Sequence, residues 1–159
     1  HCGDVDPEAL ERIVALKAWL ARTARDEGCG AAALQCWHAM QRAIGVMPCA
    51  ANGLLTDEGV PVTCETDIHG ALSSLLLGAA GLRQSPVFFA DLTVRHPTDD
   101  NAELLWHCGN FPPSLARQDR LALGRHAVEQ HGAGPHQGRV DRATADGGLG
   151  RLPCMQQTV

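Results

Sequence analysis

Hydrophobic residues recur at helical spacing near the start of the chain. Between residues 6 and 27 the large apolar side chains are Leu10, Ile13, Val14, Leu16, Trp19 and Leu20. This spacing is typical of a helix with one apolar face. Asp6 directly before Pro7 matches an N-cap followed by a proline at the first helical position. The pattern predicts an amphipathic helix over residues 6 to 27, ended by the glycines at 28 and 30.

Three short apolar runs have the length of buried strands. They cover residues 31 to 37 (AAALQCW), 60 to 64 (VPVTC) and 86 to 92 (PVFFADL). Helical pieces are expected in between, over 38 to 44, 49 to 58 and about 66 to 80. Helices that alternate with near-continuous apolar strands predict an α/β fold.

The character of the sequence changes after the third apolar run. Residues 95 to 101 (RHPTDDN) read as a polar loop, 103 to 107 (ELLWH) as a short strand and 108 to 113 (CGNFPP) as a turn. We therefore expect a domain boundary between residues 81 and 86. From about residue 132 the chain is rich in glycine and poor in large apolar residues, which predicts a loop-rich or partly disordered tail.

Composition narrows the classes of function. The chain has 159 residues, and 45% of them are apolar, which is enough for a buried core. The net charge is −5 and the 13 Lys and Arg residues are scattered, which argues against a nucleic-acid partner. The longest apolar run, residues 71 to 81, is too short for a membrane span. Seven cysteines without a C-x-x-C pair, and a start without a secretory pattern, predict reduced thiols in a cytoplasmic fragment that begins at a cut end.

Two of the predicted strands deliver a carboxylate where they end. Glu65 follows the 60 to 64 strand, and Asp91 closes the 86 to 92 strand. Ligands of open α/β sheets bind outside the carboxyl ends of strands, so both acids lie where a site is expected. Glu65 and Asp67 also have a simpler reading as helix-start acids, and His107 has one as an ordinary hydrogen-bonded histidine. Asp91 is harder to explain in this way, because a charged group at the end of an apolar strand is rarely left unpaired.

Glu65, Asp91 and His107 together would make an oxygen-rich donor set with one imidazole nitrogen. Such a set suits Mn²⁺, Mg²⁺, Fe²⁺ or Co²⁺ better than a metal that prefers thiolates. The two carboxylates are candidates for general acid and general base, and a bound ion would polarise substrate oxygens. We therefore expect one divalent metal, with Mn²⁺ favoured, and acid/base chemistry on a small polar substrate such as a sugar.

Five segments, in order along the chain, carry a resemblance to a known family. They are ALQCW (33 to 37), the stretch from MPC to GLLTDEG (47 to 59), TCETDIHGAL (63 to 72), PVFFADL (86 to 92) and LWHCGNFP (105 to 112). In this order they resemble the L-fucose isomerase-like family, which is distantly related to L-arabinose isomerase. The resemblance covers roughly half of the chain.

The resemblance implies a function and an architecture. Glu65, Asp91 and His107 correspond to metal ligands, and the two acids to the catalytic acid and base of a sugar ketol-isomerase, an intramolecular oxidoreductase. The implied reaction moves a proton between C1 and C2 of a monosaccharide through an enediol, with Mn²⁺ or another divalent cation. Residues 1 to 82 would be the end of a Rossmann-like α/β domain, and 83 to 159 the truncated start of a mostly β, barrel-like C-terminal domain. The family's pockets are completed by neighbouring subunits, so a homo-oligomer is expected and this fragment alone is expected to lack part of its site.

Three further residues are candidates for substrate contacts. Gln35 would hydrogen-bond sugar hydroxyls, Trp106 would offer an apolar face to the ring, and Asn110 would hydrogen-bond substrate. Each has an alternative as a buried amide, a packing residue or a turn residue. For the whole chain two alternatives remain, a non-catalytic metal- or sugar-binding module and, less favoured, a zinc hydrolase that uses His107.

Overall fold

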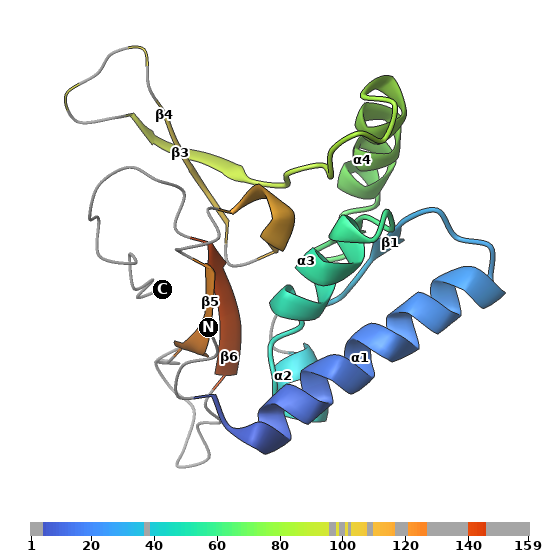
Figure 1. The fold of residues 1–159 in the computed structure, drawn as a ribbon, viewed down its shortest axis with the longest axis vertical. Helices are drawn as coiled ribbons and strands as arrows, with labels where there is room; N and C mark the ends of the chain where they lie inside the picture. Colours follow the sequence, from blue (N-terminus) through green and yellow to red (C-terminus); the bar gives the residue numbers. More distant parts are fainter. Residues whose placement is uncertain are drawn as a thin grey trace.

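The structure is a computed structural model that describes residues 5–36, 39–95, 98, 101, 103–107, 110–116, 121–126 and 140–145. Figure 1 shows four helices at one end of the described part and two β-hairpins at the other. In chain order the elements are α1 (Pro7–Asp26), β1 (Ala32–Ala33), α2 (Ala39–Ile44), α3 (Cys49–Asp57), β2 (Val62–Thr63), α4 (Ile68–Ala80), β3 (Asp91–Arg95), β4 (Glu103–Trp106), the 3-10 helix η1 (Pro113–Leu115), β5 (Leu121–His126) and β6 (Val140–Ala145).

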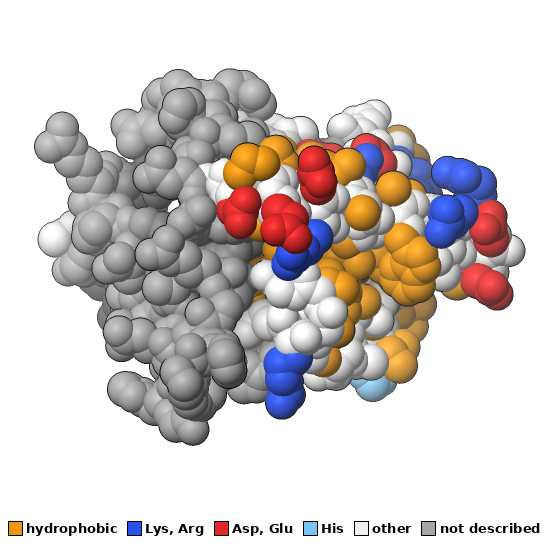
Figure 2. Space-filling model, turned by 90° about the horizontal axis from the view of Figure 1, so that it is seen from below, with side chains coloured by type: hydrophobic (Ala, Val, Ile, Leu, Met, Phe, Trp, Pro, Cys, Tyr) orange, Lys and Arg blue, Asp and Glu red, His pale blue; other side chains and the backbone are white. Residues whose placement is uncertain are grey.

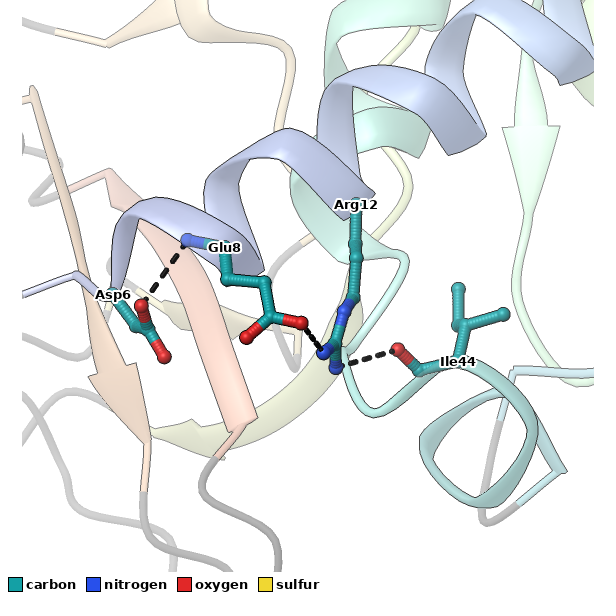
Figure 3. Close-up of polar contacts among 4 residues, drawn as sticks. All are labelled: Asp6, Glu8, Arg12 and Ile44. Atoms are coloured by element: carbon teal, nitrogen blue, oxygen red, sulfur yellow. Dashed lines mark hydrogen bonds and ion pairs between the residues drawn. The ribbon is translucent and has the colours of Figure 1, made fainter.

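Helix α1 confirms the prediction from spacing. The Asp6 carboxylate accepts a hydrogen bond from the Glu8 amide at 3.1 Å, as an N-cap should. Arg12 pairs with Glu8 and donates to the carbonyl of Ile44 at 3.4 Å, so its guanidinium joins α1 to the end of α2 (Figure 3). The last turn of α1 ends at Glu27 and at Gly28, whose φ is +66°.

The buried face of α1 forms the core together with α3 and β2. Its members are Ala9, Ile13, Leu16, Leu20, Val46, Ala50, Ala51, Leu55 and Val62. Val14 and Trp19, which the periodicity counted with the apolar face, are about half exposed on the other side of α1. Figure 2 views the molecule from the α1 side, where Lys and Arg side chains are interspersed with Asp and Glu instead of gathering in one patch.

Strands β1 and β2 form a parallel pair, which confirms an α/β arrangement of helices around a small parallel sheet. Ala32 pairs with Val62 and Ala33 with Thr63. Each strand has only two residues, so the apolar runs predict the place of the strands but exceed their length. Both strands end in loops at the same edge of the sheet.

The prediction of a strand over residues 86 to 92 is wrong for most of its length. Residues 86 to 90 have no regular structure, and β3 begins at Asp91, so Asp91 opens a strand instead of closing one. The reason is that β3 pairs antiparallel with β4, with Asp91 opposite Trp106, and this pairing is too distant in sequence for a local pattern to show. Phe88 and Phe89 pack against rings instead of joining the ladder.

The region after residue 82 contains strands and one turn of 3-10 helix among its described elements. β5 and β6 pair antiparallel, from Leu121 with Ala145 to His126 with Val140. β6 lies in the glycine-rich stretch that was expected to be loop-rich, so part of that stretch is a strand. The division into two domains stays a prediction. Among the described residues, no helix is both long enough and apolar enough to cross a membrane.

Residues 110–116 return to the helical part of the chain. The Asn110 amide donates to the carbonyl of Val62. The Ser114 amide and hydroxyl donate to the Asp57 carboxylate at 2.9 and 2.5 Å. A Cβ on Gly53 would lie 2.9 Å from the Phe111 carbonyl carbon and closer still to its oxygen. The segment after β4 is therefore docked on α3 and β2.

Helix α4 leaves its outer face uncovered in the described structure. Ile68, Leu72, Leu76, Leu77 and Leu82 are each more than half exposed. The helix has Asp67 as its N-cap and Gly81 as its C-cap, and no Asp, Glu, Lys or Arg lies between them.

The docking of Phe111 on α3 gives the first testable prediction. Gly53→Ala should lower the free energy of unfolding by about 1–3 kcal/mol, because the new methyl group has no room against the Phe111 backbone. Gly78→Ala is the matched control, since Gly78 is also helical and a Cβ there would lie 3.7 Å from Val87. The control should gain about 0.5–1 kcal/mol from helix propensity. Urea unfolding of both variants measures this, and equal gains would contradict the close approach.

Candidate active site

The candidate site begins at the edge where β1 and β2 end. Here residues 64–67 form a tight turn, which we call the Glu65 turn, closed by a hydrogen bond from the Asp67 amide to the Cys64 carbonyl at 3.0 Å. Its central residues, Glu65 and Thr66, have φ values of 57° and 59°. Two positive φ values in succession are the signature of a type I′ turn, which normally uses Asn-Gly. Here a glutamate and a β-branched threonine occupy those positions.

This backbone is strained. A non-glycine residue in the left-handed region costs about 1–3 kcal/mol and persists only where its surroundings hold it. Leu82 and Arg83 also have positive φ, but they follow the end of α4, where left-handed residues commonly close a helix. The Glu65 turn precedes a helix, so that explanation does not apply to it.

Three contacts from the loop after β1 hold the Glu65 turn. The Thr66 amide donates to the Leu34 carbonyl at 3.2 Å. The Thr66 hydroxyl donates to the side-chain oxygen of Gln35 at 2.8 Å, and the Glu65 amide donates to the Cys36 sulfur at 3.3 Å. The neighbouring strand exit therefore fixes the backbone of Glu65.

Asp67, and not Glu65, serves as the helix-start acid. The Asp67 carboxylate accepts from the Gly70 amide at 2.8 Å and caps α4. The Thr63 hydroxyl donates to the Asp67 carbonyl at 2.8 Å. The Glu65 side chain is exposed, and within the described residues its carboxylate has no hydrogen-bond or ion-pair partner. Glu65 is thus left available for another role.

Asp91 and His107 lie at neighbouring strand ends. Asp91 opens β3 opposite Trp106, and His107 directly follows Trp106. Asp91 is exposed, whereas His107 is only 7% exposed. The hairpin therefore brings the backbones of two predicted ligands close together.

His107 is enclosed by phenylalanine rings. Its ring meets Phe89 edge-on at a centroid distance of 5.3 Å and Phe111 at 6.5 Å. Phe111 is also stacked on Phe88 at 4.9 Å. A Cβ on Gly70 would lie 2.7 Å from a ring carbon of Phe89, so this ring also packs against the first turn of α4. Phe89 thus connects His107 to the helix that follows the Glu65 turn.

The structure gathers the predicted residues into two pairs. Gln35 bonds to Thr66, next to Glu65, at the sheet edge, and Asp91 lies opposite Trp106, next to His107, in the hairpin. Among the described residues, no three His, Cys, Asp or Glu side chains form a group that would hold a metal ion. The donor types of Glu65, Asp91 and His107 suit a hard divalent cation, but their arrangement here does not assemble one site.

Of the two other predicted substrate contacts, only Asn110 has a described side chain. Asn110 is 2% exposed and its amide is bonded to Val62, so it holds the chain together in this structure. The side chain of Trp106 lies outside the described part, and its predicted contact with a sugar ring stays a prediction.

Several residues of this region were not predicted from the sequence. Thr66, Cys36 and Phe89 each contact a candidate residue through the fold, and no local pattern announced them. Asn52 is fully buried on α3, and neither atom of its amide has a hydrogen-bond partner in the described part of the chain. An asparagine inside the apolar segment CAANGLL is a signal that could have found it.

Comparisons with known proteins place the chain beside sugar isomerases. No protein-family model matches it, and no solved structure does. Among curated proteins the matches include three named sulfoquinovose isomerase. That of Alkalicoccus urumqiensis is 31% identical over 113 residues, or 71% of this chain and 25% of the relative. That of Priestia megaterium is 28% identical over 109 residues, or 69% and 24%, and that of a Clostridium species is 36% identical over 100 residues, or 62% and 22%.

The chain therefore spans about a quarter of the length of these curated relatives. The similarity to these relatives confirms the expected relation to sugar isomerases as a broad class. Membership of the L-fucose isomerase-like family, and the roles of single residues, stay predictions.

The N-cap at Asp67 gives the second prediction. Asp67→Ala should lower the free energy of unfolding by about 1 kcal/mol, because the Gly70 amide loses its acceptor. Asp67→Asn keeps a capping oxygen and should change stability by only a few tenths of a kcal/mol. Urea unfolding followed by circular dichroism measures both. An equal loss in the two variants would show that charge, and not the cap, is what matters.

Proposed function

We propose that this chain carries part of the catalytic region of an aldose–ketose isomerase. The similarity to proteins named sulfoquinovose isomerase, over as much as 71% of the chain, is the observation that carries the proposal. The exposed Glu65 on a strained turn supports it, as does the place of Asp91 opposite Trp106, the residue before His107. The activity is that of a sugar ketol-isomerase, of the type found in L-fucose and L-arabinose isomerases.

The proposed chemistry uses Glu65 and Asp91 as a pair. One carboxylate removes the proton from C2 of the aldose while the other protonates the oxygen on C1, which gives an enediol. The proton on the C2 oxygen is then removed and C1 is protonated, which gives the ketose. Atoms and electrons balance without an external oxidant, so two carboxylates in opposite protonation states are sufficient for proton transfer.

A divalent ion, with Mn²⁺ favoured, is part of the proposal. Glu65, Asp91 and His107 would be its ligands, and the ion would polarise the two substrate oxygens. The donor types support this assignment. Because the described residues do not assemble the three into one group, the steps above depend only on the carboxylates.

The proposed substrate is a monosaccharide. The names of the relatives point to sulfoquinovose as the first sugar to test, and the motifs point to L-fucose and L-arabinose. Gln35 is the best placed of the proposed sugar contacts, because it is exposed beside Glu65 and its amide nitrogen is not used in the bond to Thr66. We further propose that a homo-oligomer completes the pocket.

A second candidate is a non-catalytic module that binds a sugar or a metal. The exposed side chains of Gln35 and Glu65 at the sheet edge would also serve binding alone. Binding without proton exchange separates this module from an isomerase.

The third prediction tests catalysis. The chain, incubated in D2O with sulfoquinovose, L-fucose or L-arabinose, should form the ketose and incorporate deuterium next to the carbonyl group, as NMR of the sugar would show. Glu65→Gln and Asp91→Asn should slow this exchange about 10²- to 10⁴-fold, because each removes one proton-transfer group. The exposed Glu27→Gln is the control. Sugar binding without exchange would favour the module, and unchanged exchange in Glu65→Gln would reject that residue as acid or base.

The fourth prediction tests the metal. Mn²⁺ at 100 times its Kd should raise the free energy of unfolding by about 2.7 kcal/mol if it binds only the folded chain. Glu65→Gln, Asp91→Asn and His107→Gln should each lose this gain, and excess EDTA should reverse it in wild type. Thermal unfolding with and without Mn²⁺ provides the measurement. No change in wild type would contradict the proposed metal site.

A further inference from the structure

We propose that the hydrogen bond between Thr66 and Gln35 holds the strained backbone from which the Glu65 side chain extends, so that Thr66 and Gln35 are positioning residues for the isomerase chemistry. The role in catalysis rests on the proposed function, whereas the effect of the hydrogen bond on the turn does not. It gives Gln35 a role different from the sugar contact expected from the sequence.

The conformation of the Glu65 turn is one that its residues do not prefer. Glu65 and Thr66 both have positive φ, and threonine, being β-branched, is among the residues least suited to that region. Without outside contacts, Thr66 would relax toward the extended region. Such a relaxation would turn the chain at Glu65 and move its side chain.

The backbone of Glu65 sets the Cα–Cβ direction from which its carboxylate extends. Within the described residues it has no hydrogen-bond or ion-pair partner, and its side chain is exposed. No neighbouring group therefore fixes its position from the side. The place from which the side chain starts depends on the backbone of the Glu65 turn, and so on the contacts that hold Glu65 and Thr66 at positive φ.

The contact between Thr66 and Gln35 joins side chains on the surface. Both residues are exposed, and the 2.8 Å bond from the Thr66 hydroxyl to the Gln35 oxygen links positions 31 residues apart. An exposed hydrogen bond adds little to global stability. It does connect the β1 exit to the residue directly after Glu65, while the Glu65 side chain is left free for substrate.

The two contacts made by backbone amides of the turn constrain the side chain of Thr66 less than its hydroxyl contact does. The Leu34 carbonyl and the Cys36 sulfur accept from the amides of Thr66 and Glu65, and sulfur is a weak acceptor. They hold the turn near β1 but do not hold the Thr66 side chain. The hydroxyl contact is therefore the feature that a single substitution can remove without disturbing the strand pair.

The experiment uses the full 159-residue chain, labelled for NMR. Thr66→Val keeps the β-branched shape and removes the hydroxyl, and Gln35→Met removes the acceptor. Thr66→Ser keeps the hydroxyl, and Thr66→Gly adopts positive φ without any bond. The exposed Ser73→Ala on α4 is the matched control. The readouts are the Cα and Cβ shifts of residues 65 and 66, which report φ, and the exchange rate of the Glu65 amide.

The expected result has a definite pattern. Thr66→Val and Gln35→Met should each raise the exchange rate of the Glu65 amide about five- to tenfold and move the shifts of residues 65 and 66 toward extended values. The double variant should resemble either single one, because both lose the same bond. Thr66→Ser and Thr66→Gly should keep the left-handed shifts, and Ser73→Ala should behave as wild type.

Other outcomes overturn the inference. Unchanged shifts and exchange in Thr66→Val would show that the backbone contacts alone hold the turn. Additive effects of Thr66→Val and Gln35→Met would show that they do not act through one bond. If the turn changes as expected but wild type exchanges no sugar proton, the geometric inference stands and the proposed function fails. If wild type is active, kcat should fall in Thr66→Val with little change in KM, and return in Thr66→Ser.

Discussion

The backbone of Val62 is the point where the separate parts of this fold meet. β1 bonds to the residues on either side of Val62, through Ala32 to Pro61 and Leu34 to Thr63, so the amide and carbonyl of Val62 point to the outer edge of the sheet. Buried backbone groups without partners are destabilising, and no described strand lies along that edge. The Thr56 hydroxyl accepts from the Val62 amide at 3.2 Å, and the Asn110 amide donates to its carbonyl. Side chains from α3 and from the segment after β4 thus replace a third strand.

This substitution for a strand explains how distant segments reach the same place. Thr56 brings α3 to β2, and its hydroxyl also donates to the Asn52 carbonyl at 2.9 Å. Asn110 brings the end of the β3–β4 hairpin, and with it His107, toward the same sheet. The carboxyl edge of β1 and β2 then carries Glu65. The relation between the two halves of the candidate site depends on these contacts to a two-residue strand.

The sequence predicted the elements that depend on interactions between residues close together in the chain. Helix α1 follows from apolar spacing and the Asp6 cap, both of which act within a few residues. The start of β3 at Asp91 depends on antiparallel pairing with Trp106, and the positive φ of Glu65 and Thr66 depends on residues 34–36. The dipeptide Glu65-Thr66 carries no turn signal of its own, so its positive φ values could not be predicted from the sequence. The sequence identified the candidate residues. Their division between the sheet edge and the β3–β4 hairpin could be seen only in the fold.

The outer face of α4 affects how this chain behaves in solution. Its exposed leucines and isoleucine form a continuous apolar surface of a kind that soluble monomers rarely present. Such a surface attracts other apolar surfaces, and the attraction strengthens in salts such as sulfate. Association that involves only the folded chain raises its apparent stability by mass action. Association through this face would therefore make the melting temperature depend on protein concentration and buffer as well as on internal contacts.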